Sequence, residues 1–477
     1  MSQLAADAYI DGIWEPGSRR FAVRDPYDDA IVAEVTAADA AMVERAIAAA
    51  ARAFATWKTR PGPERGGLLR QLAARMLADE VRLAELCVRE NGKPHKEALA
   101  EVRYAASFLS WFAGEAERAY GETIPATNPA QRLTVIREPV GPCALITPWN
   151  FPYAMLTRKL GAALAAGCTI VAKPAEQTPL GTLAIGQLCE QVGIPPGVVN
   201  VLPTDDAVTI GGQLLGSPAI RKISFTGSTE VGRIILRNAA EDLKRVSLEL
   251  GGNAPFVVLG DADVDAAVAH AMIAKFRNTG QSCVAANRFI LEAPIARAFT
   301  ERLVDQIRTL KLGRGSDPGV DLGPLIDDAS VRKVERLVAD AIGKGARVVH
   351  GAPPAGESRS RLVAPLVLDG ITRDMAIWRE EIFGPVVAIR HAADEADAIA
   401  QANDTEYGLV AYVFTRDGER QTRVVEALEA GMVGLNEGLV STAQAPFGGI
   451  KHSGVGREGS RHGLDDYTNL KYIAKHL

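Results

Sequence analysis

Three side chains in this 477-residue chain have the chemistry needed to attack a carbonyl carbon. Cys283, in FRNTGQSCVAAN (residues 276–287), is a candidate nucleophile, because a cysteine thiolate adds readily to carbonyl groups. The resulting oxyanion needs fixed donors, which the side-chain amide of Asn150 in TPWNFP and the backbone N–H of Cys283 can supply. Glu249 ends an alternating segment, RVSLELGG, and a partly buried glutamate with a raised pKa can act as a general base. A buried cysteine is often only a small hydrophobic residue, so the interpretation depends on the rest of the chain.

Two further segments have features of a phosphate and ribose site. FTGSTEVG places Gly227 and Ser228 at the end of an expected strand and Gly232 in the first turn of a helix, where backbone N–H groups can face an anion. This spacing is neither the G-x-G-x-x-G fingerprint nor a Walker loop, so it carries little information alone. In KPAEQTP, Lys173 ends a buried strand, and Glu176 can accept both hydroxyls of an adenosine ribose while repelling a 2′-phosphate. The alternative is a surface Lys–Glu pair that contributes little.

Strand and helix patterns alternate from Gly141 onward, which predicts a doubly wound parallel sheet. Ligands bind such sheets at the carboxyl ends of the strands, where TPWN, KPAEQTP and FTGSTEVG are expected to lie. A second alternating set runs from about Phe256 to Val433. The first hundred residues favour helices over about 39–57, 68–91 and 97–118. Residues 121–141 read as an extended hairpin, and 465–477 as an edge strand.

The bulk composition excludes several classes of protein. The net charge is −5 without a basic stripe, which argues against nucleic acid as a partner. Five scattered cysteines argue against a disulfide framework and favour a reducing compartment, so we expect the cytoplasm. The seven histidines lack metal-ligand spacing, and we expect no metal. No secretory signal and no bilayer-spanning run is visible, so we expect no membrane partner.

Seven motifs occur in order along the chain, and together they resemble the NAD(P)-dependent aldehyde dehydrogenase superfamily from about Asp11 to the C-terminus. The motifs are TPWNFP, KPAEQTP, FTGSTEVG, LELGGN, GQSC, EEIFGP and PFGGIKHSG. The resemblance implies that Cys283 is the nucleophile, Glu249 the general base and Asn150 the oxyanion donor. It also implies an α/β fold with two doubly wound sheet domains and a small β arm for oligomerisation. The implied domains are 1–120 with 141–250 for the dinucleotide, 251–440 for catalysis, and 121–140 with 460–477 for a homodimer or homotetramer.

The same resemblance implies a set of cofactor residues. Lys173 and Glu176 would hold the adenosine ribose, and Gly227 with Ser228 the pyrophosphate. Glu381 would hold the nicotinamide ribose with Phe383 beside the ring, and Leu250 and Trp149 would touch the cofactor. Because Glu176 repels a 2′-phosphate, we expect NAD+ to be preferred, while Lys173 alone is compatible with NADP+. Ala285 stands where some relatives have a second cysteine, so we expect no disulfide switch there.

The C-terminal segment, PFGGIKHSGVGREGSRHGLDDYTNLKYI, is most similar to succinate-semialdehyde dehydrogenases. Arg158, Arg277 and Ser441 match that group's carboxylate-binding residues, with Phe151 and Phe447 as apolar walls. An arginine fork suits a carboxylate, although either arginine could instead pair with a structural acid.

The implied reaction is oxidation of succinate semialdehyde to succinate through a Cys283 thiohemiacetal and a thioester, which Glu249-activated water hydrolyses. Glutarate or 2-oxoglutarate semialdehyde would meet the same arginines, because chain length is not readable from the sequence. A binding or structural relative without turnover is a third alternative, although Cys283 and Glu249 are both present.

Overall fold

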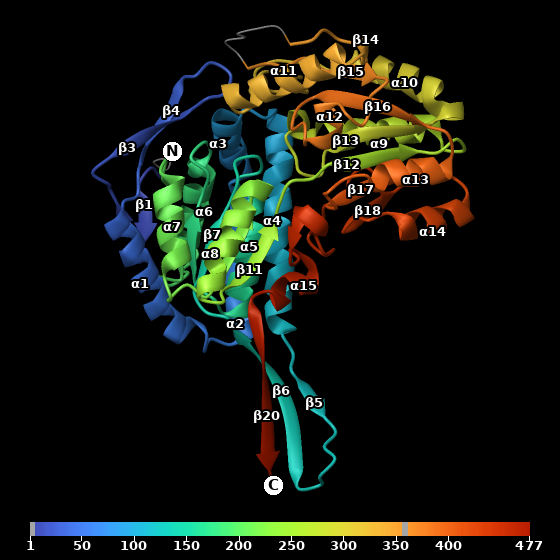
Figure 1. Cartoon of the computed structure of the whole chain (residues 1–477). Coiled ribbons are helices and arrows are strands. Elements are labelled where there is room, and N and C mark those ends of the chain that lie inside the picture. The colour runs from blue at the N-terminus through green and yellow to red at the C-terminus, as the bar shows by residue number, and fades with distance from the viewer. Residues whose placement is uncertain (1–4, 355–360) are drawn as a thin grey trace.

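The computed structural model describes residues 5–354 and 361–477. Two large sheets, each covered by helices on both faces, and a narrow arm make up the described chain (Figure 1). This arrangement confirms the expected α/β class with two doubly wound sheets. A separate antiparallel hairpin joins β3 (Arg20–Arg24) to β4 (Ile31–Thr36).

The first sheet has eight strands in the order β19-β11-β10-β7-β8-β9-β1-β2. Its five central strands, β11 to β9, are parallel, and the other three run antiparallel to their neighbours. The strands are β1 (Ala8–Ile10), β2 (Ile13–Glu15), β7 (Cys143–Ile146), β8 (Ile170–Lys173), β9 (Val199–Val201), β10 (Lys222–Thr226), β11 (Arg245–Glu249) and β19 (Gly454–Val455).

Alternating side chains of these strands pack into two different cores, as a sheet buried on both faces requires. Leu145 packs with one set of helices, and its neighbour Ala144 packs with the other. The first set is α2 (Gly62–Ala78), α3 (Glu80–Asn91), α4 (His95–Glu117), α5 (Ala154–Ala166) and α6 (Pro179–Gln191). The second set is α1 (Ala40–Trp57), α7 (Ala207–Gly216) and α8 (Thr229–Glu241).

The second sheet has seven strands in the order β14-β15-β16-β13-β12-β17-β18, and all except the edge strand β14 are parallel. The strands are β12 (Ala254–Val258), β13 (Ala286–Glu292), β14 (Arg347–His350), β15 (Leu366–Asp369), β16 (Val386–Ala392), β17 (Val410–Phe414) and β18 (Met432–Leu435). One face packs on α9 (Val264–Phe276) and α10 (Ala293–Ile307). The other face packs on α11 (Asp328–Gly343), α12 (Ala376–Arg379), α13 (Glu395–Asn403) and α14 (Gly418–Ala427).

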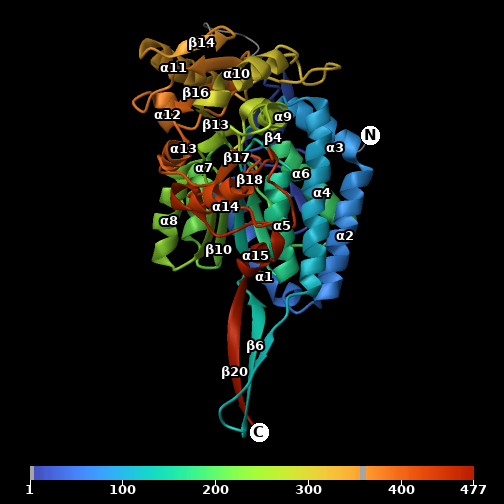
Figure 2. The ribbon, with the colours of Figure 1, turned by 90° about the vertical axis from the view of Figure 1, so that its right-hand side faces the viewer.

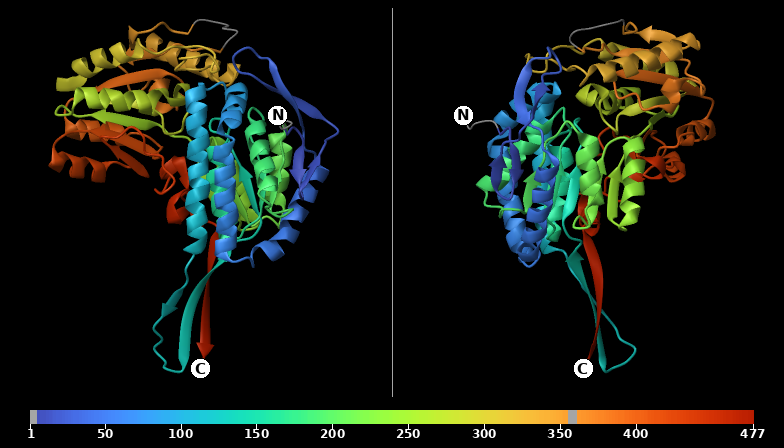
Figure 3. Two further views of the ribbon diagram at one scale, coloured as in Figure 1. Left: turned by 180° about the vertical axis from the view of Figure 1, so that it is seen from behind. Right: turned by 60° about the vertical axis from the view of Figure 1, so that its left-hand side comes forward.

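The arm is a three-stranded antiparallel sheet with the order β20-β6-β5. It consists of β5 (Glu122–Ile124), β6 (Gln131–Pro139) and β20 (Thr468–His476), and α15 (Ser460–Asp465) precedes its last strand. Figure 2 and Figure 3 show the arm extending away from both sheets, with the C-terminus near its tip. The expected hairpin and the expected C-terminal edge strand are therefore paired with each other.

The sequence-based expectations for the first hundred residues need two corrections. Residues 8–36 contain the four strands β1 to β4, which the helical interpretation missed. The helix expected over 68–91 is divided into α2 and α3 at Asp79, whose backbone angles (φ −110°, ψ 14°) leave the helical region. The short strand β19, in a segment without an expected strand, joins the edge of the first sheet beside Glu249.

None of the helices in the described residues is both long enough and apolar enough to cross a bilayer.

Candidate active site

The strand order of the first sheet brings four of the sequence motifs together. Because β11, β10, β7 and β8 are neighbours and parallel, the segments that follow them leave the same edge of the sheet. These segments carry Leu250, Gly227 with Ser228, Asn150, and Glu176. From the sequence, TPWN, KPAEQTP and FTGSTEVG were expected at this edge, and the structure places them there, with Leu250 beside them.

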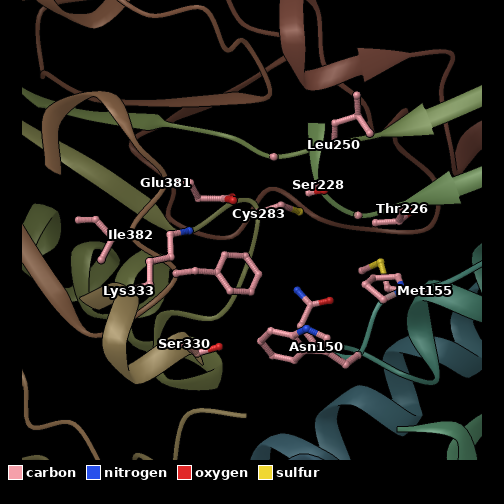
Figure 4. Close-up of a pocket in the computed structure, with 15 residues that line it drawn as sticks. Asn150, Met155, Thr226, Ser228, Leu250, Cys283, Ser330, Lys333, Glu381 and Ile382 are labelled. Carbon is pink, nitrogen blue, oxygen red and sulfur yellow. The ribbon is translucent and has the colours of Figure 1, made fainter. Parts of the chain in front are cut away.

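A cavity of about 240 Å³ lies between this edge and loops of the second sheet (Figure 4). Figure 4 shows Asn150, Cys283 and Glu381 projecting into the same space. Eight of the predicted site residues line the cavity: Trp149, Asn150, Gly227, Ser228, Leu250, Cys283, Glu381 and Phe383. The remaining lining residues were not predicted: Pro148, Met155, Thr226, Gly251, Ser330, Lys333 and Ile382.

Cys283 follows a segment of unusual backbone conformation. Asn278 (φ 51°), Thr279 (φ 57°) and Gly280 (φ 79°) are all left-handed, a region that β-branched residues such as threonine rarely adopt. Hydrogen bonds hold this conformation. The backbone N–H of Asn278 donates to Glu97 (2.8 Å), and the Thr279 hydroxyl donates to the carbonyl of Gly323 (3.1 Å). The surrounding structure therefore fixes the loop that presents the thiol.

The surroundings of Cys283 favour the protonated form of its thiol. Burial and the nearby carboxylate of Glu381 raise its pKa to about 12, while Arg158 and Arg277 act in the opposite direction. The residue is only half-buried overall, because the cavity reaches it.

Asn150 is buried, and its side-chain amide has a fixed orientation. The Nδ2 group donates to the carbonyl of Gln281 at 3.1 Å, which a flipped amide oxygen could not do. The second N–H of this amide is left to face the cavity, as an oxyanion donor requires.

Glu249 is 1% exposed and lies behind the cavity wall rather than in it. The sequence predicted a partly buried carboxylate, whereas the structure buries it completely. Neither carboxylate oxygen has a hydrogen-bond partner within the described residues. Burial, followed by the nearby Glu458, raises its pKa well above the ordinary value, while Lys159 and Arg158 oppose that shift.

Glu381 and Phe383 reach the cavity from the loop before β16. Glu381 accepts a hydrogen bond from the backbone N–H of Gly252 at 3.1 Å, and burial raises its pKa to about 7. The rings of Phe383 and Trp149 meet edge to face, with centroids 5.5 Å apart. On the opposite side, Ser228 caps α8, so Gly227 and Ser228 lie at a helix N-terminus.

Lys173 and Glu176 lie at the end of β8 and do not line this cavity. Lys173 is buried and donates to the carbonyl of Pro174 at 3.0 Å, and burial lowers its pKa while Glu176 opposes the shift. No ion pair within 4.0 Å joins these two described residues, so the surface-pair alternative does not describe them. The carboxylate of Glu176 is half-buried, which leaves it accessible to a ribose.

The predicted substrate residues form two groups. Arg158 is fully buried on α5, where it donates to the Tyr104 hydroxyl (2.6 Å) and pairs with Glu458 (3.4 Å). The Tyr104 hydroxyl also hydrogen-bonds the Ser441 hydroxyl. The ring of Phe447 lies 4.4 Å from the Arg158 guanidinium. The alternative that an arginine pairs with a structural acid therefore applies to Arg158.

Arg277 differs from Arg158, because no acidic group within residues 5–354 and 361–477 forms an ion pair with it. Its guanidinium is half-buried and lies 4.9 Å from the ring of Phe151. Arg277 lines a second, small cavity together with Ser441 and Ser282, the residue before the nucleophile.

Sequence reasoning missed functional candidates that lie outside the motifs. Ser330 and Lys333 reach the main cavity from α11, and Tyr104 links Arg158 to Ser441 from α4. The sequence signal available for Ser330 and Lys333 was their spacing, because residues three apart lie on one face of a helix. No sequence pattern marked Tyr104.

The fold and this cavity define a class: an α/β enzyme in which a doubly wound sheet meets a second sheet domain that carries a cysteine. A profile of the aldehyde dehydrogenase family matches residues 14–473, so the chain belongs to the aldehyde dehydrogenase family. Members of this family oxidise aldehydes with NAD or NADP as cofactor.

Individual relatives support the same assignment. A glutarate-semialdehyde dehydrogenase of Pseudomonas aeruginosa is 48% identical, covering 98% of this chain and 96% of the relative. An NADP+-dependent succinate-semialdehyde dehydrogenase of Escherichia coli is also 48% identical, covering 98% and 97%. A crystal structure described as an E. coli NADP-dependent enzyme has a TM-score of 0.98 at 47% identity, covering 99% of this chain and 98% of that chain.

The cavity fits a nicotinamide cofactor. Glu381 presents a half-buried carboxylate to it, and Gly227 and Ser228 lie at the N-terminus of α8, where backbone N–H groups can bind a phosphate. At Gly251 an added Cβ would lie 3.2 Å from Oε2 of Glu381, so a larger residue would crowd the Glu381 carboxylate.

Proposed function

We propose that this chain oxidises a small aldehyde that carries a carboxylate, with succinate semialdehyde as the first candidate and NAD+ as the preferred oxidant. The observation that carries the proposal is Arg277, a half-buried guanidinium beside the nucleophile loop without an acidic partner in the described chain. A cation in this setting attracts an anionic group of the substrate. The names of the two semialdehyde dehydrogenases at 48% identity support the same substrate class.

The chain's own residues supply most of the chemistry. The Cys283 thiol loses its proton to solvent in the cavity, and the thiolate sulfur adds to the aldehyde carbon to give a thiohemiacetal oxyanion. The Asn150 amide and the Cys283 N–H hold that oxyanion. Arg277 and Ser441 hold the far carboxylate, with Arg158 behind Ser441 through Tyr104 and with Phe151 and Phe447 as apolar walls.

The chemistry that a bound nicotinamide supplies is acceptance of a hydride, which leaves a thioester on Cys283. Trp149, Lys173, Glu176, Gly227, Ser228, Leu250, Glu381 and Phe383 would hold that cofactor. The ionised form of Glu249 then takes a proton from the water that attacks the thioester, and cleavage of the C–S bond releases the acid and frees the Cys283 sulfur. Both carboxylate oxygens of Glu249 lack hydrogen-bond partners within the described residues, so they are free to accept a hydrogen bond from that water once the side chain turns toward the cavity.

A second candidate substrate is glutarate semialdehyde, which the P. aeruginosa relative is named for, and 2-oxoglutarate semialdehyde would meet the same cation. Measured kcat/KM values for the four-carbon and five-carbon semialdehydes distinguish these candidates. An uncharged aldehyde of similar length that surpasses both would contradict the role of Arg277.

The substitution Arg277→Met tests that role directly. We expect kcat/KM for succinate semialdehyde to fall roughly a hundredfold or more, because a charge-assisted hydrogen bond contributes on the order of 3 kcal/mol. The value for an uncharged aldehyde should change far less. Arg302→Met, which removes an exposed arginine of α10 that pairs with Asp265, is the matched control.

The cofactor preference rests on Glu176. Glu176→Ser removes the carboxylate that would repel a 2′-phosphate, so we expect the NADP+/NAD+ ratio of kcat/KM to rise about tenfold or more. An unchanged ratio would remove Glu176 from the ribose site.

We further propose roles for the larger parts of the chain. Residues 1–120 and 141–250 would bind the dinucleotide, and 251–440 would carry catalysis. Residues 121–140 and 460–477 would join copies into a homodimer or homotetramer. The five free cysteines support a reducing setting, the cytoplasm.

A further inference from the structure

A buried lysine lies at the turn between α3 and α4, away from the cavity lining. The Lys93 ammonium pairs with Glu101 at 2.5 Å, and both side chains are almost completely buried. The same ammonium donates to the backbone carbonyl of Asn150 at 2.8 Å. A buried ion pair is weak support for stability alone, so its contact with the Asn150 backbone invites a functional explanation.

The same turn holds the residues on both sides of Asn150. The Asn91 amide donates to the carbonyl of Trp149 at 3.0 Å, and the Lys93 ammonium lies 4.2 Å from the ring of Phe151. Glu101 accepts a hydrogen bond from the backbone N–H of Tyr153 at 2.9 Å, at the start of α5. The loop that carries Asn150 is therefore fixed along its length by the turn before α4 and by Glu101 of α4.

A second donor ties Asn150 to the nucleophile loop. The Asn278 amide donates to the same Asn150 carbonyl at 3.0 Å, and the Asn278 backbone N–H donates to Glu97 in the first turn of α4. Glu97 and Glu101 thus connect one helix to the loops of both Cys283 and Asn150.

We propose that Lys93, with Glu101 as its counter-ion, is a positioning residue that holds the Asn150 amide at the place where the oxyanion forms. The inference rests on the proposed function, since it takes Asn150 as the oxyanion donor. One N–H of the Asn150 amide is already bonded to Gln281, so only one remains for the oxyanion. A small rotation of the loop would misdirect that single donor, and misplacement by about 1 Å can cost roughly a hundredfold in rate.

The test is a double-mutant cycle with the full-length enzyme. Because Lys93→Met alone leaves Glu101 buried and unpaired, the working variant is Lys93→Met/Glu101→Gln, which removes both charges and retains similar shapes. It is made in the native background and with Asn150→Ala. The matched control is Lys244→Met/Asp242→Asn, which removes a lysine that pairs with Asp242 (2.8 Å) and donates to two carbonyls at the other end of β11.

Three quantities are measured with NAD+ and succinate semialdehyde: kcat, both KM values, and the rate at which iodoacetamide alkylates Cys283. We expect Asn150→Ala to lower kcat about 10²–10³-fold. The Lys93/Glu101 variant should lower kcat roughly ten- to hundredfold. Its KM values and alkylation rate should change far less than kcat, because the variant replaces neither Arg277 nor Cys283. In the Asn150→Ala background it should lower kcat by less than about twofold further, because the donor that it positions is gone.

Two outcomes overturn the inference. One is a folded Lys93/Glu101 variant with kcat equal to that of the control. The other is a loss that multiplies fully with that of Asn150→Ala, which would indicate a general structural effect. Failure of the proposed function is distinguishable, because it would show as turnover that survives Cys283→Ala and Asn150→Ala.

Discussion

At the scale of single residues, the surroundings of both Cys283 and Glu249 favour the protonated form of the side chain. Burial is the largest of the causes that raise the pKa of both groups. Arg158 opposes both shifts, and Arg277 opposes that of Cys283. Substrate binding that changes the surroundings of these arginines therefore alters the thiol's proton affinity as well as its position.

The buried carboxyl group of Glu249 makes the stability of the protein depend on pH. Its folded pKa lies above the unfolded value, so the native state retains a proton that the unfolded state releases as the pH rises. The stability that the protonated group contributes at low pH is therefore lost as the pH rises. The free energy of unfolding falls by no more than about 1.4 kcal/mol per pH unit, because one proton is involved. Glu249→Gln cannot titrate. We expect the melting temperature of this variant, relative to that of the native enzyme, to rise between pH 5 and pH 8.

Thermal melts of both proteins at several pH values measure this difference. The other buried acids with raised pKa values, such as Glu90 (about 8), are present in both proteins and cancel. A difference that stays constant with pH would mean that Glu249 titrates at its ordinary value in the folded protein.

The element that presents the nucleophile depends on one glycine. Gly280 has φ 79°, and an added Cβ would lie 2.4 Å from the carbonyl oxygen of Gly384. Gly193 has nearly the same angle, φ 78°, but no heavy atom lies within 4 Å of its added Cβ. The pair separates backbone strain from steric overlap, because an alanine at either position meets the same strain.

We expect Gly193→Ala to lower the free energy of unfolding by about 1 kcal/mol, the cost of a left-handed alanine. Gly280→Ala should cost at least about 3 kcal/mol, as overpacking adds to the same strain, and should lower kcat because Cys283 lies three residues later. Urea unfolding and steady-state kinetics of the two variants provide the comparison. Equal costs would show that the Gly384 loop moves aside freely.

The sequence predicted some elements much better than others, for a physical reason. The alternation of strands and helices after Gly141 was predicted correctly, because buried strands and helices leave strong hydrophobic patterns. The short strands β1 and β2 were missed. They form through pairing with each other and with β9, almost two hundred residues away, which local patterns do not encode.

The residues of the candidate site also differ in how well the sequence predicted them. Residues in the motif loops, such as Asn150 and Ser228, were predicted, because a parallel sheet brings the ends of its strands together. Lys93 comes from the turn before α4 and Lys333 from α11, and their relation to the site depends on how these parts of the chain pack. The full burial of Glu249 likewise depends on Glu458 and β19, which are distant in sequence.

At the scale of the whole molecule, the arm is the feature that a single chain does not explain. It projects from both sheets, and the outer edge of β20 has no strand partner in the described chain (Figure 2). Leu470 and Tyr472 lie on one face of β20 and are 67% and 59% exposed. An exposed apolar strand of this length promotes association with other chains, so we expect a second copy of this chain to bury it.

We therefore expect Leu470→Ser/Tyr472→Ser to weaken assembly. Each lost apolar contact contributes about 1.5–3 kcal/mol, so the dissociation constant should rise on the order of 10²–10⁴-fold. Light scattering after size-exclusion chromatography measures the mass across a dilution series. Lys471→Ser, on the opposite face and paired with Glu138, is the control and should leave the mass unchanged. A native enzyme with the mass of one chain would contradict the assembly role, and so would a double variant that dissociates no more readily than the control.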